Sequence, residues 1–295
     1  VEAAAADLGY SPNVLASSLT TGRTKLVGLV SDNFHNPIFL QVFDRFTRRL
    51  QEQGLRPLLV NLSDEVDPKN SVRMLRQYSV DAVIVASSTL PVSFAQAFHD
   101  AGVPVVHAFG RKSDKPKVHV LGIDNIEAGR LAARTLIYHG YQRIGMMAGP
   151  DTATSSQDRL AGFMEVAREH SEVEVSYSFA EAYSFAAGRA EMARLLTRRP
   201  AEAYFCGDDV LSIGAISAIE SAGLSVPGDV GILGLNDMEM AGWQNINLTT
   251  IRNPFDQIVD ASIDLVAQML DTPDLRAQAM TFECEVIHRG SLRTH

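Results

Sequence analysis

Two adjacent acids, Asp208 and Asp209, follow the apolar run AEAYFCG at 201–207 and offer the oxygen ligands that a cation site needs. In a second interpretation they lie in a solvated loop after a strand, and one of them caps the next helix. The eight histidines are scattered, and none is spaced as a metal ligand with another histidine, a cysteine or an acid cluster. The helix cap is therefore favoured, and no metal is expected.

Sequence motifs of catalysis and phosphate binding are absent. The chain contains no GxxxxGK[ST] loop, no GxGxxG after the first apolar run, no HExxH and no GxSxG, and no nucleophile has an identifiable base. Cys206 and Cys284 show neither CxxC nor Cys/His spacing, so core packing in a reduced compartment is expected. The sequence favours binding over catalysis, and neither an enzyme nor a cofactor is expected.

Polar loops at the ends of apolar runs are the places where the sequence predicts binding. KLVGLVS (25–31) leads into the loop SDNFHNP, and RIGMMAG (143–149) leads into GPDTATSS. A helical pattern follows each loop. In open α/β sheets, ligands bind at the carboxyl ends of the strands, so these two loops are expected to contribute to one site.

The elements that position these loops alternate along the chain. Apolar, β-branched runs typical of strands are separated by amphipathic stretches typical of helices. Strands are expected at 25–31, 55–62, 80–87, 103–109, 118–124, 143–149, 174–180, 201–207 and 229–235, and helices at 36–53, 68–78, 92–101, 125–139, 156–169, 185–198 and 209–222. Continuous apolar strands between helices indicate parallel sheets buried on both faces. The two successive series predict an α/β fold of two doubly wound parallel-sheet subdomains.

Composition and charge limit the function classes. The chain has 295 residues, of which 46% are hydrophobic and 21% charged, as in a soluble globular protein of two domains. Its formal net charge of −9 argues against a nucleic-acid surface on the main body, so DNA binding would need a small separate segment. Every apolar run is strand-length and no signal peptide is visible, so we expect a cytoplasmic protein without membrane contact.

A short helix is predicted in YSPNVLASSL (10–19). Ser11 is a good N-cap, Pro12 suits the first helical position, and Leu15 and Leu19 lie one turn apart on one face. Isolated helices of fewer than about 12 residues are marginal in water, so this helix needs a partner.

In order and spacing, several stretches together resemble the LacI/GalR (lactose-repressor) family of bacterial transcription regulators. They are LGYSPNVLASSL (8–19), TKLVGLVSDNFHNPIF (24–39), VDAVIV (80–85), IDNIEAGRLAARTLIYHGYQRIGMMAGP (123–150), DRLAGF (158–163), AYFCGDDVLSIGAISAIESAGLSVPGDVGILGLND (203–237) and LTTIRNP (248–254). The resemblance implies a periplasmic-binding-protein-like core after a short N-terminal hinge segment. It divides the chain into a headpiece remnant (1–9), a hinge helix and linker (10–23), an N-terminal subdomain (24–124 plus 254–280) and a C-terminal subdomain (125–253 plus 281–295).

The resemblance also gives the short helix a role. In this family the hinge becomes helical when the dimer sits on its operator, and paired hinge helices enter the minor groove. Asn13, Leu15, Ser18 and Leu19 would be the hinge residues, with Leu19 as the apolar wedge between base steps. In the alternative interpretation this helix caps the core, and both leucines are buried.

An effector site in the cleft between the subdomains is a further implication of the resemblance. Arg159 corresponds to the family's ligand-binding arginine, whose planar fork can hold two oxygens at once. Ser155 lies where relatives offer a hydroxyl, although Ser156 next to it is an equally good helix cap. Tyr183 matches a position often filled by a stacking aromatic ring, with burial in the core as its alternative.

The remaining candidates come from other strand ends. Phe39 matches an effector-contacting position or is a core residue, and Asp124 either faces the effector or caps the helix from 125. Asp208 aligns with a small or amide residue that contacts effector in some members, and Asn236 stands where the family commonly has an aspartate. Two further aromatic residues are possible cleft-lining residues, Phe109 and Trp243.

The resemblance implies a ligand-responsive DNA-binding regulator, acting as a repressor. Its partners would be a second copy of the chain, an operator reached through the hinge and headpiece, and a sugar or sugar acid. One arginine, one aspartate, an amide and aromatic faces suit a neutral or singly anionic polyol. The alternative is a periplasmic sugar-binding protein, which shares the two-subdomain architecture but has no hinge.

Overall fold

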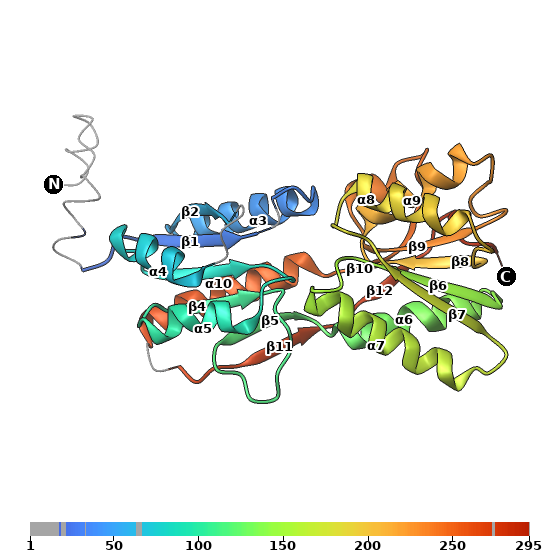
Figure 1. The fold of residues 1–295 in the computed structure, drawn as a ribbon. Coiled ribbons are helices and arrows are strands. Elements are labelled where there is room, and N and C mark those ends of the chain that lie inside the picture. Colours follow the sequence, from blue (N-terminus) through green and yellow to red (C-terminus); the bar gives the residue numbers. More distant parts are fainter. Residues whose placement is uncertain (1–17, 19–21, 33, 63–66, 273–274, 295) are drawn as a thin grey trace.

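The computed structural model describes residues 18, 22–32, 34–62, 67–272 and 275–294. It shows two α/β subdomains side by side, each built on one six-stranded sheet with helices on both faces (Figure 1). The predicted class, two doubly wound subdomains with mostly parallel sheets, is confirmed.

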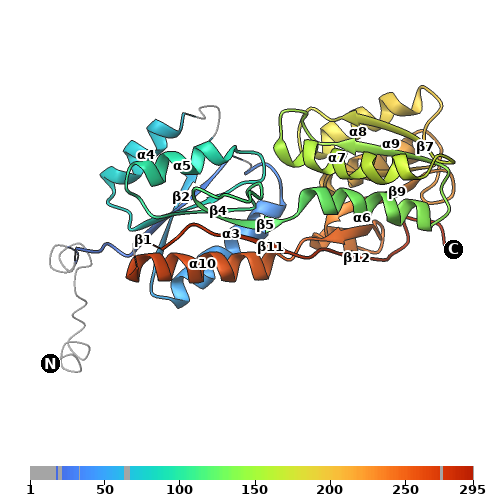
Figure 2. The same ribbon diagram turned by 90° about the horizontal axis from the view of Figure 1, so that it is seen from below.

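The sheet of the N-terminal subdomain, sheet A, is entirely parallel. Its strands run in the spatial order β2 (Arg56–Asn61), β1 (Leu26–Ser31), β3 (Ala82–Ala86), β4 (Val105–Ala108), β5 (His119–Ile123) and β11 (Ala279–Phe282). Helices α3 (Ile38–Glu52) and α10 (Phe255–Asp271) cover one face, and α4 (Pro68–Gln77) and α5 (Val92–Asp100) the other (Figure 2). Phe46 of α3 and Phe98 of α5 are fully buried, so both faces of the sheet are core.

The C-terminal subdomain repeats this plan in sheet B. Its strands run in the order β7 (Glu174–Phe179), β6 (Arg143–Ala148), β8 (Ala203–Cys206), β9 (Gly231–Asn236), β10 (Thr249–Arg252) and β12 (Glu285–Ile287). Only the β10–β12 pair among these neighbours is antiparallel. Helices α6 (Asn125–Tyr138) and α7 (Thr154–Glu169) lie on one face, and α8 (Phe185–Leu196) and α9 (Asp209–Ser221) on the other, with the short η1 (Glu239–Gly242) after β9 (Figure 1).

The chain crosses between the subdomains at three places. It crosses at Asp124 between β5 and α6, at Asn253 and Pro254 between β10 and α10, and at 283–284 between β11 and β12. The third crossing lies two residues after the boundary expected at 280/281, because β11 continues pairing with β5 through Phe282. Neither subdomain is therefore a single stretch of chain.

Most of the predicted hinge lies outside the described residues, including Asn13, Leu15 and Leu19. Ser18 is described: it is helical and half-buried, and its carbonyl accepts the N–H of Gly22 at 2.9 Å.

Among the described residues, no helix combines the length and apolarity needed to cross a membrane.

Candidate functional site

An inner cavity lies between the subdomains, where strands of both sheets end. Its volume is about 40 Å³. It is lined by Asn36, Ile38, Phe39, Val42, Ser88, Phe109, Arg159, Tyr183, Asp208, Asn236, Asn253 and Phe255. The loops after β1, β3, β4, β7, β8 and β10 contribute to this wall together with the end of β9, as expected for ligand sites of open α/β sheets. Five of the seven predicted effector residues come together here: Phe39, Arg159, Tyr183, Asp208 and Asn236.

Arg159 enters the cavity from the first turns of α7 and is 5% exposed. Its Nε donates to Oδ1 of Asn125 at 2.8 Å, and its Nη1 donates to the carbonyl of Gly207 at 2.7 Å. Helices α6 and α7 approach closely because Gly129 and Gly162 lack side chains: a Cβ on Gly129 would collide with the backbone of Arg159, and one on Gly162 with that of α6. The guanidinium is thus held through Nε and Nη1, and Nη2 has no hydrogen-bond partner among the described residues.

Asp208 is a buried hydrogen-bond acceptor at the start of α9. As the N-cap, it accepts the N–H of Val210 with Oδ1. Its Oδ2 accepts from Nδ2 of Asn36 at 2.7 Å and from Nδ2 of Asn236 at 3.1 Å. Burial is the largest influence on this carboxyl and raises its pKa, while the hydrogen bond from Asn36 opposes the rise. Because Asn36 belongs to the other subdomain, this bond crosses the cleft.

The neighbouring acid, Asp209, has a structural role. It is fully buried, and it accepts from the hydroxyl of Thr250 at 2.6 Å and from the N–H of Met238 at 2.8 Å. Burial raises its pKa well above the ordinary range. The expected helix cap is present at Asp208, but the expected solvated loop is wrong, since both acids are buried. In the described part of the chain, no group of three or more acids, histidines and cysteines could hold a metal ion.

Aromatic rings form the apolar part of the cavity wall. Phe109 and Phe255 meet edge to face with ring centroids 5.6 Å apart. Phe39 lines the cavity and also packs against Phe43 of the core, with centroids 5.9 Å apart, so its predicted core role is confirmed and its contact with an effector stays a prediction. Tyr183 lines the cavity, and its hydroxyl lies 2.9 Å from the Ser156 hydroxyl, which restrains the orientation of the ring.

Two of the predicted effector residues, Ser155 and Asp124, do not line the inner cavity. Ser155 is buried behind Tyr183, with the two hydroxyls 3.4 Å apart. Its neighbour Ser156 is not the helix cap, because α7 begins at Thr154. Asp124 is the N-cap of α6, where it accepts two backbone N–H groups and lies 3.3 Å from Nζ of Lys112. Of its two predicted roles, the structure shows capping.

The two further aromatic candidates separate. Phe109 lines the cavity. Trp243 follows η1 on the surface and is 51% exposed, so the structure does not place it in the cavity wall.

Sequence reasoning did not single out six cavity residues, although the first of them lies in the predicted binding loop SDNFHNP: Asn36, Ile38, Val42, Ser88, Asn253 and Phe255. Two of them could have been found from the sequence. Asn36-Pro37 and Asn253-Pro254 are both Asn-Pro pairs between a strand and a helix, where ligands of open α/β sheets bind. Asn253 is 8% exposed, and its Oδ1 is buried without a hydrogen-bond partner. A buried polar atom of this kind is a free acceptor for a bound molecule.

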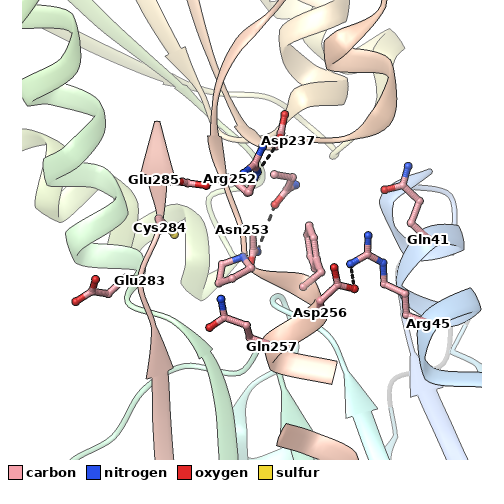
Figure 3. A pocket seen from close by; sticks show the side chains of 13 residues that line it. Gln41, Arg45, Asp237, Arg252, Asn253, Asp256, Gln257, Glu283, Cys284 and Glu285 are labelled. Atoms are coloured by element: carbon pink, nitrogen blue, oxygen red, sulfur yellow. Dashed lines mark hydrogen bonds and ion pairs between the residues drawn. The ribbon is translucent and has the colours of Figure 1, made fainter. Parts of the chain in front are cut away.

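A larger outer pocket of about 590 Å³ adjoins the inner cavity and shares Asn236, Asn253 and Phe255 with it. Figure 3 shows its charged wall, in which the chain crossings at 252–257 and 283–285 face Gln41 and Arg45 of α3. Arg45 pairs with Asp256, and Nε of Arg252 lies 2.8 Å from Asp237. The outer pocket thus presents ion pairs, whereas the inner cavity combines amides, one arginine and aromatic rings.

The cysteines are free thiols without catalytic surroundings. Burial raises the pKa of Cys206 to about 12 and that of Cys284 to about 11, so neither is an activated nucleophile.

Comparisons with known proteins agree on one family. Residues 133–292 match the model of the periplasmic binding protein-like domain. The PurR repressor of Actinobacillus pleuropneumoniae serotype 3 (strain JL03) is 28% identical over 291 residues, which cover 97% of this chain and 86% of the relative. The transcriptional regulator DegA of Bacillus subtilis (strain 168) is 28% identical over 258 residues, which cover 85% and 76%. Both relatives are transcription regulators, as opposed to periplasmic binding proteins or enzymes.

Solved structures give the same result. A complex of the regulator CelR with cellobiose superimposes with a TM-score of 0.79 at 27% identity, covering 98% of this chain and 89% of that one. The lac repressor dimer bound to operator and the anti-inducer ONPF superimposes with a TM-score of 0.86 at 22% identity, covering 99% and 89%. At 22% identity the second likeness establishes the fold.

Proposed function

The chain belongs to the family of periplasmic binding protein-like domains and forms the ligand-responsive core of a LacI/GalR transcription regulator, and we propose that it is the core of a homodimeric repressor whose effector, a sugar or sugar acid, binds in the inner cavity. In this proposal the effector selects one orientation of the two subdomains. That orientation decides whether the two hinges of the dimer can meet on an operator.

The convergence of Arg159, Asp208 and Asn236 with aromatic rings in one buried cavity is the observation that carries this proposal. A guanidinium donates, a carboxylate accepts, and an amide does both, so together they can bind the several hydroxyls of a polyol. Phe109 and Phe255 offer apolar faces to a sugar ring. The CelR complex with cellobiose is in agreement.

The size of the cavity constrains how a ligand enters. About 40 Å³ is room on the order of one water molecule, far less than a sugar needs. Binding must therefore separate the subdomains or move cavity side chains. The three crossings are short connections that can act as hinges for such a movement.

A second copy of the chain is proposed to cover one apolar side. Leu40 on α3, Phe185 at the start of α8 and Trp243 after η1 are 77%, 45% and 51% exposed. Helices α3 and α8 lie on the same side of the molecule (top in Figure 1). Exposed apolar side chains on both subdomains are candidates for an interface, and we propose that a two-fold dimer buries them.

Calorimetry against cellobiose, glucose, gluconate, hypoxanthine and spermidine tests the effector class. We expect a neutral or singly anionic polyol to bind, and its affinity to fall in Arg159→Ala. Spermidine should not bind, because its cationic groups would face Arg159 directly. Tight binding of spermidine would contradict the proposal.

A further inference from the structure

Among the residues that the structure describes, two side-chain contacts join the subdomains at points away from the chain crossings. Nδ2 of Asn36, before α3, donates to Oδ2 of Asp208, before α9, at 2.7 Å. Nη2 of Arg111, after β4, donates to Oδ1 of Asp158 in α7 at 2.6 Å. Any opening of the cleft that separates these elements must break both contacts.

The two contacts differ in environment. Asn36 and Asp208 are 2% and 3% exposed, so water does not compete for their hydrogen bond. The Arg111 side chain is 51% exposed, and exposed ion pairs are weakened by water and salt. The buried amide–carboxylate bond is therefore the stronger of the two.

The orientation of the Asn36 amide is fixed at both ends. Its Oδ1 accepts the N–H of Ile38 at 3.1 Å at the start of α3, which turns Nδ2 toward Asp208. Asn36 also lines the inner cavity, so its amino group occupies a place from which a ligand could donate to the same carboxylate.

We propose that Asn36 is the latch of the inner cavity: it holds the subdomains closed by donating to Asp208, and a ligand binds by replacing that donor. The identity of the cavity as the effector site rests on the proposed function, whereas the latch acts in the free protein and can be measured without a ligand.

The latch sets a condition on the ligand. A molecule that displaces the Asn36 amino group must itself bring an O–H or N–H to Oδ2 of Asp208, because a carboxylate only accepts. The unpartnered Oδ1 of Asn253, in the same cavity wall, requires a second donor. The cavity is thereby selective for ligands with at least two donor groups, such as the hydroxyls of a polyol, and excludes ligands that carry acceptors alone.

The variant Asn36→Asp tests the latch while keeping the oxygen that accepts the N–H of Ile38. It replaces the amino group with an oxygen, so that two carboxylates face each other across the cleft and repel. Fluorescent dyes on cysteines introduced at the exposed positions Ser93 and Glu220, in a Cys284→Ser background, report the separation of the subdomains by energy transfer. Asn70→Asp, in α4 of the same subdomain, is the matched control.

Above pH 7 we expect Asn36→Asp to shift the open-to-closed ratio of the free protein by roughly tenfold or more, which corresponds to about 1.4 kcal/mol. Asn70→Asp should leave the ratio unchanged. On acidification the two carboxyls can share one proton, so the variant should close again. Equal energy transfer in Asn36→Asp, Asn70→Asp and the parent protein at all pH values would overturn the proposal.

The double variant Asn36→Asp/Asp208→Asn exchanges donor and acceptor across the cleft. It restores one amide–carboxylate hydrogen bond, so we expect the closed population to return. If it stays open, the Asn36–Asp208 hydrogen bond is not what holds the subdomains closed, and the latch is refuted. Should no compound bind to the parent protein while the swap restores closure, the effector proposal fails and the latch stands.

Discussion

Truncation of Arg159 should reduce stability and effector affinity by separate routes. The side chain is 5% exposed and holds the carbonyl of Gly207 and the amide oxygen of Asn125 at 2.7 and 2.8 Å. Arg159→Ala leaves both buried oxygens without a donor, at about 1–3 kcal/mol each, so we expect the free energy of unfolding to fall by about 2–6 kcal/mol. Arg159→Lys can satisfy one of the two oxygens and should lose about half as much.

The effect on affinity comes from the nitrogen that the protein does not use. Nε and Nη1 are bound internally, and Nη2 is left for the ligand. Losing a charged donor to a buried ligand oxygen should weaken effector binding by about 2–4 kcal/mol, or roughly 30- to 1,000-fold. Lysine cannot reproduce the planar fork, so Arg159→Lys should also bind weakly.

Urea unfolding measures the first effect, and calorimetry with the polyol that binds the parent protein measures the second. Arg168→Ala is the control, because Arg168 is an exposed residue of the same helix. A folded Arg159→Ala protein with full affinity would show that the site is misplaced. Unchanged unfolding in urea would refute the buried hydrogen bonds.

Three further predictions concern the operator, the dimer and pH. In the full-length protein, Leu19→Ala should weaken operator affinity in a binding assay and leave effector affinity unchanged; equal loss of both would argue against a hinge role. The double variant Leu40→Arg/Trp243→Arg places charges in the proposed dimer interface, so it should sediment as a monomer at micromolar concentration, where the parent protein should be a dimer. A variant that still sediments as a dimer would show that these residues are not in the interface. Burial lowers the pKa of His107 from 6.5 to about 4. The free energy of unfolding should therefore be highest above about pH 6.5, where this histidine is neutral in both the folded and the unfolded protein, and should fall as the pH drops through 4. The loss should be about 3 kcal/mol in urea unfolding and should be absent in His107→Gln, whose amide can still donate to the carbonyl of Ser87.

Much of the fold could be predicted because the central strands are continuous apolar runs. VDAVIVAS contains β3, whose five residues are all buried. The edge strands β11 and β12 have four and three residues, none of them buried, so they lack the apolar signal that marks a strand. Their pairing with β5 and β10 depends on tertiary contacts between distant parts of the chain.

The cavity was only partly predictable for a related reason. Arg159 and Asn236 stand in stretches whose order and spacing resemble a family pattern, and both line the cavity. Asn36 and Asn253 are short amides next to prolines, and by sequence alone such residues suggest turns. Only the packed subdomains show that one donates across the cleft and that the other carries an unpartnered oxygen.

The three crossings also affect how the protein folds during synthesis. The first five strands of sheet A leave the ribosome early, but β11 and the covering helix α10 follow nearly all of the other subdomain. At about 5–20 residues per second, the wait between β5 and β11 lasts on the order of ten seconds. During that time β5 has an unpaired edge, and the sheet face that α3 and α10 share is covered by α3 alone, which are features that favour aggregation. The N-terminal subdomain begins to be translated first but is therefore completed only after most of the C-terminal subdomain has been made, and its open β5 edge is a surface that a chaperone would protect.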